Sequence, residues 1–426
     1  MGRRSRDTEG NGGGALTMVK RSKDCRPDTL LATGGRRAEW TGTPDHPGAV
    51  ASPPVWRAST HLYPDMAAHR EGPRHNQDGR FFYGRRGSPT QWALAEALTD
   101  LEPGAFGTVL YPSGLAAIVG ALLAVVEPGD VLLVSDNAYE PSRATATGML
   151  RRMGVDTRFF DPLDVDAYRA AFCERTRAVL LESPGSLTME VCDTPALAAI
   201  AREHGAVSLV DNTWASALGF PALQHGCDIA IMALTKHVGG HSDLLMGSAS
   251  AGEELYCKLR HTAQALGHVV SPDDASLALR GLRTMGLRLR QTTAAALEIA
   301  NWLQSRDEVA HVLCPMLPGA PGHELWTRDF SGGCGLFSFV LKGRDADARA
   351  RLIDGLQLFG IGYSWGGFES LAIPFDPAPI RTSTAWPPAG WNKEDRLGVR
   401  LSIGLEDPAD LIADLEAAFA ALDTET

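Results

Sequence analysis

The strongest constraint on the fold is an alternation of short apolar runs and helical stretches that extends from Thr108 to Ser250. Most of the apolar runs are continuous, as in Val131-Leu132-Leu133-Val134, and do not alternate with polar residues. Such strands are buried on both faces, and helices between them are the crossovers of a parallel sheet. The sequence therefore predicts an α/β fold with a mainly parallel sheet. The predicted strands are 131–134, 157–160, 178–181, 207–210 and 229–232, and the predicted helices are 113–126, 141–153, 166–173 and 194–204.

The last of these helices has recognisable end signals. Thr194 is expected to be its N-cap, and Pro195 then takes the first helical position, where a missing N–H is tolerated. Gly205 is expected to end the helix.

The pattern changes after Ser271, where a long Leu/Ala/Arg-rich helix precedes fewer and shorter strands. This change predicts a smaller C-terminal α+β domain. The predicted helices are 276–301, 346–359 and 408–422, the predicted strands are 335–341 and 398–403, and the proline-rich segment 371–391 is predicted to be a loop.

Four parts are predicted along the chain: a disordered tail at 1–26, an arm at 27–86, a large domain at 87–282 and the C-terminal domain at 283–426. The tail is basic and glycine-rich, and the sequence leaves open whether Met1 or Met18 is the start. The arm is rich in proline and glycine, yet it contains apolar residues such as Trp56 and Leu62. We therefore expect it to lie on a neighbouring subunit.

Composition excludes several classes of partner. The 40 basic and 51 acidic residues give a net charge of −11, which argues against binding to nucleic acid or to an anionic membrane. No apolar run approaches the roughly 20 residues that a membrane span requires, and the N-terminus lacks the apolar core of a secretory signal. The seven cysteines form no C-x-x-C pair. Reduced thiols in a cytoplasmic protein are therefore expected.

Two residues follow predicted strands at the edge where parallel sheets bind ligands. Asp211 ends the strand 207–210, and Lys236 comes shortly after 229–232. A desolvated lysine is a nucleophile for carbonyls, and a buried carboxylate requires a cationic partner. The pyridine nitrogen of pyridoxal 5′-phosphate (PLP) would be such a partner. Each residue also has an explanation that involves no cofactor, since Lys236 could reach solvent and Asp211 could cap a turn.

A third feature is the helix start at Ser113-Gly114, which exposes backbone N–H groups next to the positive end of the helix dipole. Such a helix start can bind a phosphate, although every helix N-terminus exposes N–H groups in this way. Thr235 could add a hydroxyl to the phosphate. His237, His241 and Asp243 cluster nearby, but no metal is expected, and His241 is expected to hydrogen-bond within its own loop.

These features occur within strings that resemble the Cys/Met-metabolism branch of fold-type I PLP-dependent enzymes, and within it the cystathionine β-lyases. The resemblance covers residues 27–422, with the strings in the family order. It implies a fold-type I, PLP-dependent transferase-like fold, with PLP bound by the large domain. The matching strings are 81–87, 137–142, 181–186, 211–214, 235–236, 240–243, 280–284, 363–367 and 400–404.

The resemblance also implies roles for individual residues. Lys236 would hold PLP as a Schiff base, Asp211 would pair with the pyridine nitrogen, and Tyr139 would stack on the ring. Gly114, Leu115 and Thr235 would bind the phosphate. Tyr83 and Arg85 would reach that phosphate from a neighbouring subunit. The resemblance therefore implies at least a dimer, and the family suggests a tetramer. Arg400 would bind the α-carboxylate of an amino-acid substrate, with Ser364 and Trp365 beside it.

The reaction implied is α,β-elimination of L-cystathionine to homocysteine, pyruvate and ammonia. Ser364-Trp365-Gly366-Gly367 and Ala233 resemble the β-lyases, whereas γ-acting relatives usually carry S-L-G-G and a serine at those two places. Phe368 departs from the familiar tyrosine. Alternatives are another cysteine S-conjugate β-lyase or cysteine desulfhydrase, a γ-lyase or γ-synthase, and a catalytically silent regulatory protein. The sequence leaves the physiological substrate and the pathway open, including a role in methionine synthesis.

Overall fold

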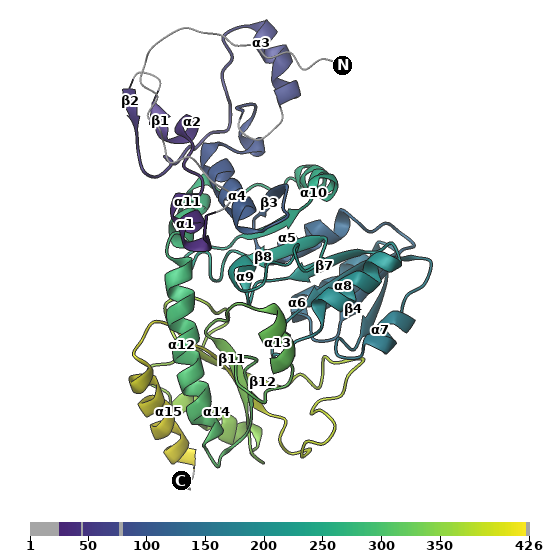
Figure 1. Ribbon diagram of the computed structural model, residues 1–426, viewed down its shortest axis with the longest axis vertical. Helices are drawn as coiled ribbons and strands as arrows, with labels where there is room; N and C mark the ends of the chain where they lie inside the picture. The colour runs from purple at the N-terminus through teal and green to yellow at the C-terminus, as the bar shows by residue number, and fades with distance from the viewer. Residues whose placement is uncertain (1–24, 44–45, 76–79, 423–426) are drawn as a thin grey trace.

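A seven-stranded sheet forms the centre of the computed structural model, which describes residues 25–43, 46–75 and 80–422 (Figure 1). The strand order is β3-β9-β8-β7-β6-β4-β5. The last five strands in this order run parallel to one another, while β9 is antiparallel to both of its neighbours. The mainly parallel sheet is thus confirmed. The strands are β3 Gly107–Tyr111, β4 Val131–Ser135, β5 Asp156–Phe160, β6 Thr176–Glu182, β7 Val207–Asp211, β8 Ile229–Ala233 and β9 Gly247–Ala251.

Helices cover both faces of this sheet, which explains why residues 131–134 of β4 are all apolar. Val131 and Leu133 pack into one buried cluster, whereas Leu132 and Val134, which point the opposite way, pack into the other. The helices of this region are α4 Pro89–Leu101, α5 Gly114–Leu123, α6 Glu140–Thr145, α7 Val165–Ala170, α8 Thr194–Glu203, α9 Ser216–Gly219, α10 Glu253–Ala265 and α11 Pro272–Leu282, with a π-helical turn η3 Ala146–Leu150 after α6.

A second, antiparallel sheet with the order β10-β11-β13-β12 forms the core of the C-terminal part, and the long helix α12 leads into it (Figure 1). The helices α12 and α14 both pack against α15. This arrangement confirms the predicted smaller α+β domain. Its elements are α12 Met285–Gln304, β10 Val309–Leu313, α13 His323–Asp329, β11 Leu336–Leu341, α14 Ala346–Gly355, β12 Leu371–Phe375, β13 Gly398–Ser402 and α15 Pro408–Leu422.

Several predicted helix ends were wrong. The helices predicted at 113–126 and 166–173 end earlier, at Leu123 and Ala170. The N-cap of α8 is Asp193 and not Thr194, because the Asp193 carboxylate accepts a 3.1 Å hydrogen bond from the backbone N–H of Ala196. The helix predicted at 346–359 ends at Gly355 instead, because the carboxylate of Asp414 accepts from the backbone N–H groups of Gln357 and Leu358, at 2.8 to 3.1 Å.

Two longer predictions also require correction. The helix predicted at 276–301 is interrupted at Arg283–Thr284, where Thr284 leaves helical geometry (φ −110°, ψ 5°) and α12 begins anew. The predicted loop 371–391 begins with the strand β12, which contains Pro374. A proline is tolerated there because β12 is the edge strand of its sheet, so one row of its N–H groups has no partner strand.

The N-terminal region contains α1 Pro27–Thr33, α2 Ala38–Thr41, β1 Gly42–Thr43, β2 His46–Ala49, α3 Met66–Glu71 and the short helices η1 Gly72–His75 and η2 Gly84–Arg86. The helix α1 packs on α4 and α12 of its own chain, and the Arg283 guanidinium donates to the carbonyl oxygens of Leu31 and Gly34. In contrast, Leu62 and Met66 are exposed. The predicted tail lies outside the described residues apart from Cys25 and Arg26.

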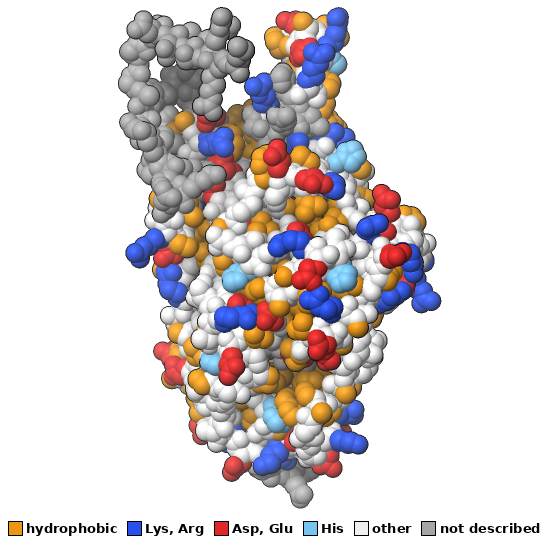
Figure 2. All heavy atoms as spheres, turned by 45° about the vertical axis from the view of Figure 1, so that its right-hand side comes forward, with side chains coloured by type: hydrophobic (Ala, Val, Ile, Leu, Met, Phe, Trp, Pro, Cys, Tyr) orange, Lys and Arg blue, Asp and Glu red, His pale blue; other side chains and the backbone are white. Residues whose placement is uncertain are grey.

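The surface carries no dominant charge of one sign on the face drawn in Figure 2, where acidic and basic side chains are interspersed. Over the ranges that the structure describes, no helix is both long enough and apolar enough to cross a membrane. Those same ranges contain no group of three or more His, Cys, Asp or Glu side chains that could hold a metal ion.

Candidate active site

Functional side chains gather where the parallel strands of the large sheet end. Asp211 is the last residue of β7, Glu182 is the last residue of β6, and Lys236 follows β8 by three residues. Tyr139 follows β4 and precedes α6. Because the carboxyl ends of parallel strands lie along one edge, the sheet brings these four residues together from distant parts of the sequence.

Lys236 contacts the C-terminal part through its amine. Its Nζ donates to Oγ of Ser364 at 2.6 Å and lies 5.3 Å from the ring centre of Trp365. Burial, together with the nearby positive charge of Arg400, lowers the pKa of Lys236 to about 8, although Asp211 opposes the shift. The neutral, nucleophilic fraction of the amine near neutral pH is therefore larger than for an ordinary lysine.

Asp211 is held in a fixed orientation by Thr213. Its Oδ1 accepts from the backbone N–H and the hydroxyl of Thr213, at 3.0 and 2.5 Å, while that hydroxyl accepts from the backbone N–H of Ala233 at 2.9 Å. Burial raises the pKa of Asp211 from its ordinary value. A carboxylate in such surroundings is stabilised by a cation, and the protonated pyridine nitrogen of PLP has the required charge.

The start of α5 fits the phosphate seat that the sequence predicts. Ser113 is the N-cap, and its Oγ accepts from the backbone N–H of Ala116 at 3.1 Å, which leaves the N–H groups of Gly114 and Leu115 without partners inside the helix. A Cβ at Gly114 would lie 2.6 Å from the Cβ of Ala233. Only glycine therefore lets the helix start approach β8 this closely.

Thr235 is engaged with the backbone of Met246. Its hydroxyl donates to the carbonyl oxygen at 3.2 Å and accepts from the N–H at 3.0 Å. These bonds fix the turn that carries Lys236. The phosphate contact expected of Thr235 stays a prediction.

The end of the site that is expected to bind the substrate is formed by Ser364, Trp365 and Arg400. Ser364 has a left-handed backbone (φ +84°), a strained conformation that lets its hydroxyl reach Lys236. The guanidinium of Arg400 donates to the carbonyl oxygen of Ser364 at 3.2 Å, and burial lowers the pKa of Arg400 to about 10. The fork of Arg400 is thus held beside Lys236, where a carboxylate could pair with it.

His237 supports this end of the site. The ring is buried, with Nε2 3.2 Å from the carbonyl oxygen of Trp214, and it packs edge-on against Trp365 with 5.2 Å between ring centres. Burial lowers the pKa of His237 to about 3. The neighbouring His241 lies within hydrogen-bonding distance of the Gly239 carbonyl, at 2.8 Å, which confirms the expected bond inside its loop.

Tyr83 and Arg85 are not brought to Lys236 by the fold of one chain. Tyr83 is exposed, and the guanidinium of Arg85 donates to the carbonyl oxygen of Gln264 on α10 at 2.9 Å. Within the described residues, no hydrogen bond or ring contact joins either residue to Lys236, Asp211 or Tyr139. Their expected role at a neighbouring subunit stays a prediction.

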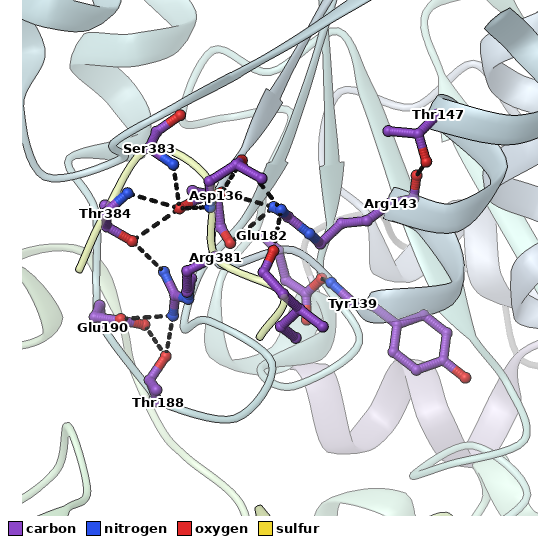
Figure 3. A network of polar contacts seen from close by, with 12 residues as sticks. Asp136, Tyr139, Arg143, Thr147, Glu182, Thr188, Glu190, Arg381, Ser383 and Thr384 are labelled. Atoms are coloured by element: carbon purple, nitrogen blue, oxygen red, sulfur yellow. Dashed lines mark hydrogen bonds and ion pairs between the residues drawn. The ribbon is translucent and has the colours of Figure 1, made fainter. Parts of the chain in front are cut away.

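The sequence did not reveal a polar network near Tyr139 that joins the region of the large sheet to residues 381–384 of the C-terminal part (Figure 3). Asp136, just after β4, accepts from the guanidinium of Arg143 at 2.8 Å and from three consecutive residues, 382–384. Arg381 donates to Glu190 at 2.9 Å and to Thr188 at 2.5 Å. The available signal was the position of Asp136 at a strand end, which is the same signal that marked Asp211.

Comparison with known proteins agrees with this geometry. The Cys/Met metabolism PLP-dependent enzyme family matches residues 38–420. The chain is 43% identical to cystathionine beta-lyase MetC of Escherichia coli, over 93% of this chain and 99% of that protein, and 44% identical to a putative cystathionine beta-lyase of Rhizobium johnstonii, over 92% and 98%.

Among solved structures, cystathionine gamma synthase from Xanthomonas oryzae pv. oryzae, in complex with aminoacrylate and cysteine, superposes with a TM-score of 0.83. It is 32% identical, and the alignment covers 94% of this chain and 99% of that one. The fold-type I architecture expected from the sequence is confirmed by this match. The chain belongs to the family of Cys/Met metabolism PLP-dependent enzymes.

Proposed function

We propose that this chain is a PLP-dependent carbon–sulfur β-lyase that cleaves L-cystathionine to homocysteine, pyruvate and ammonia. The observation that carries the proposal is the 2.6 Å contact between the Lys236 amine and Ser364, which places the Ser364-Trp365 turn next to the reactive lysine. The two cystathionine β-lyase relatives support it, at 43% and 44% identity over nearly their whole lengths. The seven free cysteines favour a cytoplasmic location.

Each site residue then has a task. Bound PLP supplies an electron-accepting ring that stabilises negative charge at the substrate Cα. Arg400 binds the substrate α-carboxylate, and Asp211 provides the negative charge for the ring nitrogen. Lys236 would hold the cofactor through its amine, and this amine would take the Cα proton of the substrate. The Cβ–S bond would then break as a Cα–Cβ double bond forms, and the sulfur would take up a proton, so that homocysteine leaves as the thiol. Water would hydrolyse the remaining three-carbon fragment to pyruvate and ammonia.

The products formed from cystathionine test this proposal against its alternatives. We expect the purified holoenzyme to release pyruvate and homocysteine in equal amounts. A γ-lyase would release 2-oxobutyrate, and a γ-synthase would form a replacement product instead. The values of kcat/KM for cystine and for other cysteine S-conjugates show whether cystathionine is the preferred substrate. No turnover of any of these compounds by PLP-loaded protein would favour the silent regulatory alternative.

We further propose that the site is shared between subunits of an oligomer. This oligomer is at least a dimer, and membership of the family suggests a tetramer. Tyr83 and Arg85 lie in the segment before α4, and each is exposed rather than packed at the site of its own chain. In the proposed dimer these two side chains reach the phosphate at the partner's Lys236.

Complementation tests the sharing of the site. The Lys236→Ala and Arg85→Ala proteins are expected to be nearly inactive separately. When they are unfolded and refolded together in equal amounts, half of the dimers are mixed, and one of the two sites in each mixed dimer is intact. Activity should therefore return to about a quarter of the wild-type value. If both contributions came from the same chain, the mixture would stay inactive.

A further inference from the structure

Glu182 and Asp211 form a pair of neighbouring carboxyl groups at the centre of the site. The two residues are directly opposite each other in the parallel pairing of β6 with β7. Residues in this relation point to the same side of a sheet. Both are half-buried, so neither carboxyl group is fully solvated. Two like charges this close cannot both be accommodated without cost.

The surroundings of the pair assign the negative charge to Asp211. Two hydrogen bonds from Thr213 stabilise ionised Asp211, and the Lys236 amine is close to it. Among the residues that the structure describes, Glu182 accepts one hydrogen bond, 2.6 Å from the backbone N–H of Tyr139 to its Oε2. A neutral carboxylic acid can accept this bond through its carbonyl oxygen.

The charged groups around Glu182 act in both directions. Burial and then the charge of Asp211 raise the pKa of Glu182 well above its ordinary value, and Glu190 adds to the increase. The hydrogen bond from Tyr139 and the charge of Arg381 lower the pKa, but by less. Of the two neighbouring carboxyl groups, Glu182 thus retains its proton more readily.

The hydrogen bond to Glu182 determines where Tyr139 lies. Tyr139 is the residue just before α6, in non-helical geometry (φ −48°, ψ 128°), and the residue is 43% exposed. In Figure 3 its ring points away from the network around Asp136, while its backbone N–H points at Glu182. A shift of this backbone would move the ring with it.

We infer that Glu182 is a positioning residue that, as a neutral acid, holds the Tyr139 backbone so that the ring covers the cofactor, and leaves the negative charge of the pair on Asp211. This role rests on the proposed assignment of Tyr139 and Asp211 as cofactor contacts. Glu182 would thus position the side chain of Tyr139 without contacting the substrate itself.

Three substitutions of Glu182 distinguish the effects of its charge, its reach and its hydrogen-bond acceptor. Glu182→Gln keeps an acceptor at the same reach without a charge, Glu182→Asp keeps the acid but shortens its reach, and Glu182→Ala removes the acceptor. We expect the affinity for PLP to fall roughly tenfold with alanine, to fall less with aspartate and to stay within about threefold of wild type with glutamine. The matched control is Glu190→Gln, which changes a nearby carboxylate that does not contact Tyr139.

Infrared spectra of the substrate-free holoenzyme provide a second measurement. At pH 8 the wild-type protein and the Glu190→Gln protein should show the carbonyl band of a protonated carboxyl group, and the Glu182→Gln protein should lack it. The inference is overturned if this band is the same in Glu182→Gln and wild type. It is also overturned if aspartate preserves PLP affinity better than glutamine does, or if alanine has no effect. Since neither measurement uses a substrate, a wrong reaction assignment would leave both results unchanged.

Discussion

Replacement of Lys236 by alanine is expected to reduce kcat/KM for cystathionine by at least about a thousandfold, because in the proposed mechanism the same amine binds the cofactor and removes the Cα proton. The visible absorbance band of the lysine-bound cofactor should disappear with it. Steady-state pyruvate release and the absorption spectrum measure the two effects. The pKa of about 8 adds a pH dependence, because the neutral fraction of the amine increases as the pH passes through that value. In wild-type apoprotein the rate of PLP attachment should therefore rise between pH 7 and pH 9.

Lys258→Ala is the matched control for this experiment. Lys258 lies on α10, where its amine pairs with Glu254 at 2.9 Å on the surface. Its loss should leave both the spectrum and the activity within twofold of wild type, since an exposed pair of this kind contributes little. A Lys236→Ala protein that retained the absorbance band and steady turnover would refute the assignment of Lys236.

The second large effect is expected at Asp136, on the stability of the fold. Asparagine at this position would remove the negative charge that pairs with buried Arg143. Its NH2 group would also replace one of the two carboxylate oxygens, both of which accept hydrogen bonds from neighbouring N–H and O–H groups. Removing one partner of a buried ion pair typically costs about 3–5 kcal/mol. We therefore expect Asp136→Asn to lower the free energy of unfolding in urea by about 3 kcal/mol or more.

The control is Asp156→Asn, since Asp156 pairs with Arg158 at 3.0 Å on the surface. This substitution should change the free energy of unfolding by less than about 1 kcal/mol. Equal losses for the two variants would show that the network around Asp136 does not hold residues 382–384 in place.

The effect of Asp136 should depend on pH in the acid range. Burial by itself would raise the pKa of Asp136, but the hydrogen bonds from Ser383, Thr382 and Thr384 outweigh it and lower the pKa to about 2. The unfolded chain has a pKa of about 3.9 for this group. The stabilisation is therefore complete above that value and is lost as the pH falls towards 2. The difference between wild type and Asp136→Asn should shrink over the same interval.

The sequence predicted the large sheet well, because burial on both faces requires continuous apolar runs that remain visible in a linear chain. The strands around Val131 and Ile229 were found within a residue or two of their ends. Helix ends were predicted less well. A cap such as Asp193, or an acceptor such as Asp414, competes with the next turn of the helix through contacts that propensity does not describe.

The strand β12 was missed for a related reason. Pro374 argues against a strand in the middle of a sheet, and only the order of the strands shows that β12 lies at an edge.

The sequence by itself determined the fold class and the positions of Lys236 and Asp211, since a polar residue at the end of an apolar parallel strand must lie at the ligand-binding edge. Tertiary structure alone decided which residues meet them. Ser364 contacts Lys236 across 128 positions, and Thr382 contacts Asp136 across 246. The pairing of Glu182 with Asp211 depends on the register of β6 against β7. Such contacts arise from packing between distant segments, and no local pattern of residues encodes them.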